Sequence, residues 1–335
     1  MKTAIVILNW NGREMLERFL PSVVFFSQRP GREIVVADNG STDDSLTFLS
    51  ANYPGIRQII LDKNYGFAEG YNRALAQIDA EYFLLLNSDI EVTPGWLDPL
   101  EAKLDASPEI AAVMPKLRSY TDREKFEYAG AAGGFIDWLG YPFCRGRVLQ
   151  TVEMDHGQYD EGREIFWATG ACMLVRAPLF REYGGFDASF FAHQEEIDLC
   201  WRWKSDGYRI WVEPQSVVFH VGGGTLSADS PHKTFLNFRN NLAMLYKNLS
   251  GKTLWGVLIL RLVLDGFSAV VFLLQGKKAH FKLVWKAHRA FFRMRKELKA
   301  KRRRIQKKRT ATPSGIYRGS IVWRYYTGRK ISPVK

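Results

Sequence analysis

The chain has 335 residues, 46% of them hydrophobic, so it is long enough to bury one large core or two smaller ones. Its net charge of +12 is unevenly spread, because residues 277–335 hold 21 of the 47 Lys and Arg residues but only one of the 35 acidic residues. Residues 1–276 therefore carry a net charge of −8, which confines any anionic partner, a membrane surface or a nucleic acid, to the C-terminal segment.

Short apolar runs alternate with helical periodicity along the first 90 residues. Four runs are typical of buried strands, at residues 3–8, 33–37, 56–61 and 82–86. Helical periodicity runs from Met15 to Val23, and a second helix is expected from about residue 69 to 80. This alternation predicts a parallel, doubly wound α/β sheet.

Polar clusters follow three of these strands, at residues 9–12, 38–44 and 87–89. Each cluster alone is ordinary turn chemistry. Their recurrence at the carboxyl ends of the strands favours a shared ligand site, because ligands of open α/β sheets bind at that edge. No GxGxxG follows the first strand, which argues against an NAD enzyme. We predict that residues 87–89 form the metal and diphosphate corner of a sugar-nucleotide site.

Two further groups of polar residues lie in the second half of the body. Glu195, Glu196 and Asp198 open a predicted helix, where acidic residues are also favoured simply by the helix dipole. Asp198 and Arg202 have the spacing of an ordinary i,i+4 pair. His220 ends an apolar run, where a lone histidine is ordinarily a packing residue or makes a capping bond.

The aromatic residues of the region from 138 to 167 have two interpretations. Trp138, Tyr141, Phe143 and Trp167 would suit an acceptor platform, because sugars stack on aromatic faces, but core packing explains any one of them as well. Trp201 and Trp203 lie in a predicted helix and are expected to be packing residues.

The C-terminal segment predicts amphipathic helices. Arg261 and Asp265 interrupt the apolar stretch 254–275, and each would cost about 2.5–3.5 kcal/mol near a bilayer centre. In the next segment the apolar face comprises Phe281, Val284, Trp285, Phe291 and Phe292, and the basic face comprises Lys282, Lys286, Arg289, Arg293 and Lys296. With the basic cluster 299–304, this pattern is typical of a helix in a membrane interface, although a solvated tail would carry the same charge.

Eight segments in order resemble the signatures of family 2 glycosyltransferases, and most of all the bacterial rhamnosyltransferase-like branch: Ala4–Gly12, Val35–Asp43, Asn64–Ala68, Leu86–Asp89, Thr169–Leu174, Gly184–Asp187, Glu195–Arg202 and His220–Gly224. The resemblance covers roughly the first 240 residues. It implies a GT-A fold, with a Rossmann-like, mostly parallel central sheet flanked by helices. The C-terminal amphipathic, basic helices would extend this fold.

The resemblance also implies the roles of individual residues. The donor-binding set would be Asn9, Asn11, Asp38, Lys63, Asn64, Gly66, Asn72, Asn87 and Ser88, with Asp38 on the base. Many relatives carry Asp-x-Asp where this chain has 87–89, so Asp89 alone would ligate Mg²⁺ or Mn²⁺, with His220 as a further ligand. Glu196 occupies the position of the general base, and Glu195 is the second choice.

The predicted organisation is a GT-A domain at 1–250, divided into a nucleotide-sugar half (1–115) and an acceptor and catalytic half (116–250), followed by membrane-associating helices at 251–335. The predicted activity is inverting transfer of a sugar from a nucleotide-diphosphate donor to a lipid-linked saccharide in cell-surface glycan synthesis. The favoured donor is dTDP-rhamnose, and a UDP-hexose is the next choice. A nucleotidyltransferase would need a Gly-rich basic phosphate loop near the first strand, and none is found. An inactive, membrane-tethered nucleotide-sugar binding protein is the other alternative.

The predicted location is the cytoplasm, at the inner face of the cell membrane. Three widely separated cysteines without metal-ligand spacing favour a reducing compartment, and the apolar run 4–8 is too short for a signal peptide. Residues 254–310 would bind an anionic membrane surface peripherally, and no nucleic-acid partner is expected.

Overall fold

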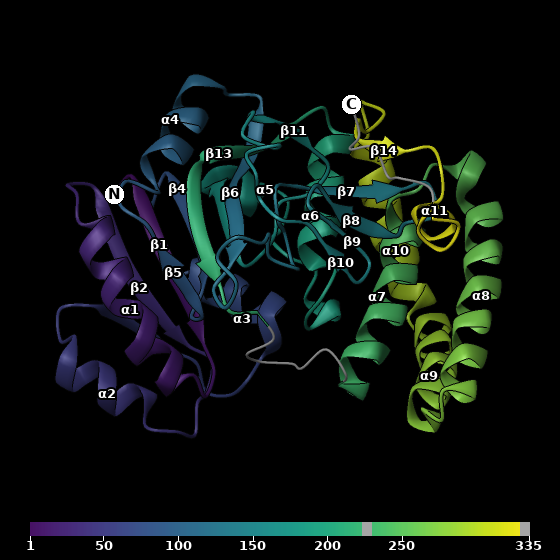
Figure 1. Ribbon diagram of the computed structural model, residues 1–335, viewed down its shortest axis with the longest axis horizontal. Helices are drawn as coiled ribbons and strands as arrows, with labels where there is room; N and C mark the ends of the chain where they lie inside the picture. Colours follow the sequence, from purple (N-terminus) through teal and green to yellow (C-terminus); the bar gives the residue numbers. More distant parts are fainter. Residues whose placement is uncertain (223–229, 329–335) are drawn as a thin grey trace.

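A nine-stranded sheet lies at the centre of the computed structural model, which describes residues 1–222 and 230–328 (Figure 1). The strand order is β11-β13-β6-β12-β4-β1-β2-β3, and β5 pairs with β13. The strands are β1 (Thr3–Asn9), β2 (Arg32–Asp38), β3 (Arg57–Ile60), β4 (Tyr82–Asn87), β5 (Ile90–Val92), β6 (Ile110–Ser119), β11 (Arg163–Ile165), β12 (Cys172–Arg176) and β13 (Arg209–His220).

The four strands predicted in the first 90 residues form the parallel half of this sheet. β1 lies between β2 and β4, and β2 pairs with β3. β1 and β4 are buried along almost their whole length, as their continuous apolar sequences predict. In the other half β12 is antiparallel to both β4 and β6, whereas β13 is parallel to β6. The sheet is therefore mixed, and the carboxyl ends of β1, β2 and β4 share one edge.

Three helices connect the strands of this half: α1 (Arg13–Ser27), α2 (Ser45–Asn52) and α3 (Gly66–Leu75). A fourth helix, α4 (Asp98–Ala106), follows β5 and packs against β6, β12 and β13. The helix predicted over residues 69–80 corresponds to α3, which begins three residues earlier and ends at Leu75. Gly66 has a φ of 76°, a conformation that glycine adopts without strain, and its N–H donates to Asn64 Oδ1 over 2.7 Å. The chain therefore enters α3 directly from the predicted donor segment.

A second, five-stranded sheet was not predicted, because its strands are only two to four residues long and show no periodicity. Its strands are β7 (Gly134–Asp137), β8 (Pro142–Cys144), β9 (Arg147–Val148), β10 (Thr151–Val152) and β14 (Ile316–Tyr317). β14 belongs to the C-terminal segment and pairs in parallel with β7. Asp137 Oδ2 also accepts the N–H of Ile321 over 3.0 Å, so contacts cross the expected boundary at residue 250.

The remaining helices are α5 (Ala177–Glu182), α6 (Glu195–Ser205), α7 (Pro231–Asn248), α8 (Gly251–Leu274), α9 (Lys278–Arg293), α10 (Arg295–Lys308) and α11 (Ile321–Tyr326), with a short 3-10 turn η1 (Ala188–Phe190) before α6. The helices from α7 to α11 form the right-hand part of Figure 1, next to the small sheet. α7 packs against α8, α9 and α10 and also contacts α6. α7 therefore links the C-terminal helices to the body.

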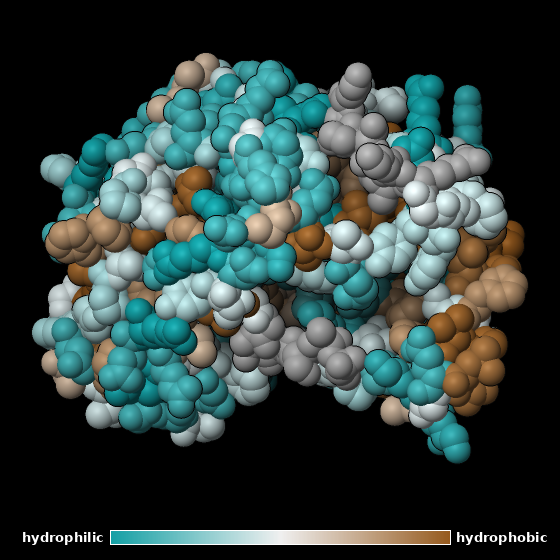
Figure 2. All heavy atoms as spheres, in the orientation of Figure 1, coloured by the Kyte–Doolittle hydropathy of each residue, from teal (hydrophilic) through white to brown (hydrophobic). Residues whose placement is uncertain are grey.

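α8 is long and apolar enough to cross a membrane, by length and composition alone. Its charged stripe faces the protein: Arg261 donates to the carbonyl of Leu139 over 2.9 Å and pairs with Asp265 at 3.3 Å. The opposite face is apolar and exposed, with Trp255 63%, Ile259 61% and Phe267 65% accessible. Figure 2 shows hydrophobic side chains gathered over this edge of the molecule.

The single apolar face predicted for α9 is divided in the structure. Val284 and Phe291 are buried, because α7 and α8 cover that side of the helix. Trp285 and Phe292 are each about half exposed. The predicted basic cluster 299–304 is divided in the same way, since Lys301 and Arg302 contact the body of the protein whereas Lys299, Arg303 and Arg304 are exposed.

Candidate active site

The turns after β1 and β2 are joined by a buried amide–carboxylate contact. Asn9 Nδ2 donates to Asp38 Oδ2 over 3.1 Å, and Asp38 Oδ1 accepts the N–H of Ser41 over 2.9 Å. Asn9 Oδ1 is buried and has no hydrogen-bond partner among the described residues. A Cβ at Gly12 would lie 2.4 Å from this oxygen, so only glycine fits beside it. The edge thus holds one paired carboxylate and one unused amide acceptor.

Asn11 strengthens the same junction from its exposed position. Its Oδ1 accepts the N–H of Thr42 over 2.7 Å, and its own N–H donates to Ser41 Oγ over 2.9 Å. Asn11 adopts a φ of 49°, the left-handed region that asparagine tolerates better than most residues. Its side chain therefore ties the β1 turn to the β2 turn.

The segment before α3 is anchored by Asn39, a residue without an individual role in the predicted site. Asn39 Nδ2 donates to Asn64 Oδ1 over 3.1 Å and to the carbonyl of Gly66 over 3.0 Å, while its Oδ1 accepts the N–H of Tyr65. The side chain of Lys63 is exposed, with its ammonium 5.1 Å from the ring centroid of Tyr65. The predicted residues 63, 64 and 66 are thus brought to the Asp38 edge.

The side chain of Asn72 makes its hydrogen bonds to the backbone of Phe186. Its amide donates to the carbonyl of Phe186 over 2.9 Å and accepts the N–H of the same residue over 3.0 Å. A Cβ at Gly185 would lie 2.3 Å from Asn72 Oδ1. Both polar atoms of the Asn72 side chain therefore hold the Gly-Gly-Phe-Asp segment.

The predicted metal corner lies where β4 and β13 end. His220 Nε2 is 3.1 Å from Asp89 Oδ1 and 3.5 Å from Asn87 Nδ2. Ser88 lies against the β1 turn, since a Cβ at Gly12 would be 3.5 Å from Ser88 Oγ. The structure thus brings His220 to residues 87–89. Gly223 and Gly224 of the predicted His220 motif lie outside the described residues.

Glu127 completes this corner and carries no signal in the sequence, because it lies in an irregular segment. Its Oε1 is 3.3 Å from His220 Nδ1, and both side chains are buried. Burial opposes charge on His220, but Glu127 and Asp89 outweigh it and raise the pKa of His220 to about 10. Burial likewise raises the pKa of Asp89, yet the bond to His220 leaves it below its usual range. Residues 1–222 and 230–328 hold no cluster of three or more His, Cys, Asp or Glu side chains in a metal-ligating arrangement.

The two acids of the predicted catalytic motif open α6 and are not a solvated helix start. Glu195 is 4% exposed, and Glu196 packs beside Gly170. The Oε2 atoms of both residues are buried and find no hydrogen-bond partner within the described ranges. Burial, and then repulsion by Glu196, raises the pKa of Glu195. Burial raises the pKa of Glu196 to about 7, close to that of a general base at neutral pH.

The loop before these acids has an unusual backbone. Phe191, His193 and Gln194 have φ values of 66°, 70° and 74°, and such conformations cost on the order of 1–3 kcal/mol each in residues other than glycine. Asn240, fully buried on α7, donates to the carbonyls of residues 190, 192 and 193 over 2.8–3.0 Å. No sequence pattern pointed to Asn240, because its acceptors lie about 50 residues away.

The aromatic residues are largely core residues, as expected for most of them. Trp201 and Trp203 are buried on α6, and Trp167 and Phe143 are buried near the small sheet. Trp138 is 39% exposed. Of the four tryptophans considered above, at positions 138, 167, 201 and 203, Trp138 alone is exposed.

Residues 4–184 match the family described as glycosyl transferase family 2. The N-acetylglucosaminyl-diphospho-decaprenol L-rhamnosyltransferase of Mycobacterium tuberculosis is 29% identical over 234 residues, which are 64% of this chain and 75% of that protein.

Two solved structures of low sequence identity share the fold. TarS 1–349 of S. aureus, in complex with UDP-GlcNAc, aligns with a TM-score of 0.58 at 17% identity over 99% of this chain and 93% of that chain. GalNAc-T7 with UDP, GalNAc and Mn²⁺ aligns with a TM-score of 0.56 at 16% identity over 74% of this chain and 48% of that chain. The predicted GT-A fold is confirmed.

Proposed function

The chain belongs to glycosyl transferase family 2, and we propose that it transfers a sugar with inversion from a nucleotide-diphosphate donor to a lipid-linked saccharide. The observation that carries this proposal is the pair of buried carboxylates that opens α6, since Glu196 has the pKa of a general base. dTDP-rhamnose is the first donor to test and a UDP-hexose the second, because a relative of the chain is a rhamnosyltransferase.

Asp38 and Asn9 would bind the base of the donor. A pyrimidine imide N–H would donate to Asp38, whose carboxylate is buried and already fixed by Ser41. The unused Asn9 Oδ1 is a second acceptor at the same edge. Because a wrong base would leave the buried Asn9 Oδ1 without a donor, this edge would discriminate between bases.

Asp89 and His220 fit a divalent metal. They supply one carboxylate oxygen and one imidazole nitrogen that lie 3.1 Å apart. Because the raised pKa of His220 keeps its ring protonated near neutral pH, a metal bound through Nε2 would displace the proton from that nitrogen. Glu127 faces the other ring nitrogen of His220 and would fix the imidazole for metal binding through Nε2. A metal held there would offset the charge that develops on the departing diphosphate.

Glu196 would take the proton from the acceptor hydroxyl as its oxygen attacks the anomeric carbon from the face opposite the diphosphate. Glu195, beside it in the same turn of α6, is the second candidate, because burial and repulsion by Glu196 raise its pKa as well. The acceptor oxygen forms the new glycosidic bond while the bond to the diphosphate breaks. No covalent intermediate with the protein is required.

Membrane association would place the site beside its acceptor. Trp255, Ile259 and Phe267 of α8 continue into the exposed aromatic rings of Trp285 and Phe292 on α9. Exposed basic residues accompany these rings: Lys282, Lys286, Arg289 and Arg293. An outward apolar face flanked by cations suits an interface with anionic lipid. Because Arg261 and Asp265 face the protein, α8 would lie on the membrane and not across it.

The test combines donor binding with transfer. Thermal shifts with dTDP-rhamnose, UDP-glucose and UDP-GlcNAc, each with Mn²⁺ or Mg²⁺, would identify the donor, since a ligand that binds only the folded state raises the melting temperature. The protein is then incubated with the same donors and a synthetic GlcNAc-diphospho-prenyl lipid, and the mass of the product is measured by mass spectrometry. A glycosylated lipid is expected. Donor stabilisation without any transfer to this or related lipid-linked saccharides would favour the binding-protein alternative.

A further inference from the structure

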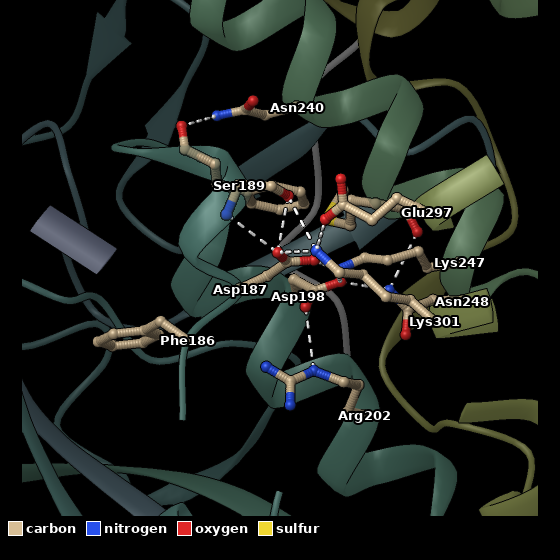
Figure 3. A network of polar contacts seen from close by, with 12 residues as sticks. Phe186, Asp187, Ser189, Asp198, Arg202, Asn240, Lys247, Asn248, Glu297 and Lys301 are labelled. Atoms are coloured by element: carbon tan, nitrogen blue, oxygen red, sulfur yellow. Dashed lines mark hydrogen bonds and ion pairs between the residues drawn. The ribbon is translucent and has the colours of Figure 1, made fainter. Parts of the chain in front are cut away.

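A network of charged side chains joins α6, α7 and α10 (Figure 3). Its centre is Asp187, which follows the Gly-Gly-Phe segment and has a side chain only 5% exposed. Asp187 pairs with Lys247 of α7 and, at 2.5 Å, with Lys301 of α10. Burial raises the pKa of Asp187, but these two lysines hold it well below its usual range.

Lys247 contacts both ends of the loop that carries the strained residues. Besides Asp187 before the loop, it pairs at 2.9 Å with Asp198, one turn into α6. Asp198 is also held by Asn248 over 2.7 Å and by Arg202 over 3.0 Å. The first turn of α6, with Glu195 and Glu196, lies between these anchored carboxylates.

The loop itself is attached to both halves of the site. Ser189 donates its hydroxyl to Asp187 over 2.7 Å, and Asn240 holds the carbonyls on the α7 side. On the donor side the N–H of Ala68 donates to the carbonyl of Phe191 over 3.0 Å. The three positive φ values can persist because these attachments determine the backbone from outside.

α10 contributes to this arrangement as a docked helix. Arg302 donates to the carbonyls of Tyr246 and Leu249, and Arg309 donates to the carbonyl of Asn248 over 2.6 Å. These bonds satisfy the carbonyls at the C-terminal end of α7, which have no partner within that helix. The docked helix thereby holds the ammonium of Lys301 next to the carboxylate of Asp187.

From these contacts we infer that Lys301 is a positioning residue: through Asp187 it fixes the loop 187–194 and so holds Glu196 in place for proton transfer. The C-terminal basic helix is then part of the catalytic unit, in addition to any role at a membrane. The inference rests on the proposed function, because it assigns Lys301 to the reaction of the same site.

Lys301 is the member of the network best suited to a test. It is 29% exposed, and in its absence Asp187 keeps its pair with Lys247. The variants are Lys301→Met, Lys301→Arg and, as a matched control, Lys307→Met. Lys307 is an exposed lysine near the end of α10, so its replacement removes the same charge without touching Asp187.

The assay uses dTDP-rhamnose, or the donor identified above, and a short-chain lipid-linked acceptor without vesicles, so that membrane binding does not contribute. Lys301→Met should lower kcat by about 10- to 100-fold, because misplacement of a catalytic group by about 1 Å has effects of this size. The donor Kd should change less than about twofold. Lys301→Arg should recover most of the rate, and Lys307→Met should match the wild type.

Hydrogen exchange on the full chain provides the second readout. Lys301→Met should speed exchange in residues 188–196 and leave β1 unchanged. A lower melting temperature with wild-type kcat would overturn the inference, and so would equal losses in the Lys301 and Lys307 variants. Should Lys301→Met fail to fold, Lys301→Gln gives the same comparison. An inactive wild-type protein would contradict the proposed function instead, so the two failures are distinguishable.

Discussion

The donor edge and the acid pair are built in opposite ways. At the donor edge the side chains of Asn9, Asn11 and Asp38 join turns about 30 residues apart in sequence, and within residues 1–222 and 230–328 Asn9 Oδ1 finds no hydrogen-bond partner. At the acid pair one buried oxygen each of Glu195 and Glu196 has no partner in the same described ranges, and their loop is held by α7 and α10. A binding edge can be stable by itself, whereas a general base needs a raised pKa that its surroundings must sustain.

This contrast predicts different consequences of mutation in the two regions. Changes at the donor edge should weaken binding. Changes at the acid pair should lower the rate and, because burial of charge is unfavourable, should preserve or raise stability.

The largest effect is expected for Glu196→Gln. Loss of the general base should lower kcat for transfer by about 10²- to 10⁴-fold with donor binding retained. Because the raised pKa of Glu196 disfavours its charged form in the folded state, stability falls as pH rises from about 4.5 to about 7. The Gln variant should therefore melt no lower than the wild type at pH 8. Glu195→Gln is the control, and a complete loss of activity in that variant alone would move the base to Glu195.

Asp89→Asn comes next. With one strong metal ligand gone, metal-dependent transfer should fall at least about 10²-fold, and titration with Mn²⁺ should show weaker binding. Glu91→Gln, two residues along the chain, removes a carboxylate paired with Arg123 and serves as the control. Equal activity in the Asp89 variant and the wild type would refute the metal assignment.

Asp38→Asn should act on binding. The substitution replaces one carboxylate acceptor with a donor that faces the base, so the donor Kd should rise by about 10- to 100-fold with a smaller change in kcat. Calorimetry with the donor measures it. Glu33→Gln, at the other end of β2, should leave binding unchanged. A normal Kd for Asp38→Asn would show that the base lies elsewhere.

The pH profile should separate the two regions in the wild-type protein. Since the pKa of Glu196 is raised to about 7, kcat should fall about tenfold per pH unit below that value, where the base is protonated, and level off above it. Donor affinity measured over the same pH range should not show this decrease below pH 7. A rate that is flat between pH 5 and pH 8, from about two units below the transition to about one unit above it, would be incompatible with Glu196 as the base.

The smallest effect is expected at the membrane face. Trp285→Ser together with Phe292→Ser should reduce sedimentation with anionic liposomes by about tenfold, because two half-exposed rings lose their apolar contact with lipid. Phe25→Ser, an exposed aromatic residue on α1, is the control. A deletion of 277–335 is less informative, since it also removes β14 and Lys301. Unchanged sedimentation of the double variant would place the contact elsewhere.

The sequence by itself determined the parallel half of the sheet and the polar clusters along its edge. Residues 3–8 and 82–86 predict strands through local apolar runs, and the turn residues that follow them bond to neighbouring turns. Such information is local, so it can be read without knowing how the chain folds back on itself. It also gave the positions of Glu195, Glu196 and His220, through motifs that the family shares.

The tertiary structure alone decided which distant side chains contact those residues and so set their pKa values. Glu127 reaches His220 from an irregular segment, Asn240 holds a loop about 50 residues away, and Lys301 pairs with Asp187 across 114 residues. It also turned the charged stripe of α8 inward and divided the basic segment 299–304 between body and solvent. Burial and long-range pairing set the pKa of a carboxylate, and neither has a periodic signature in sequence.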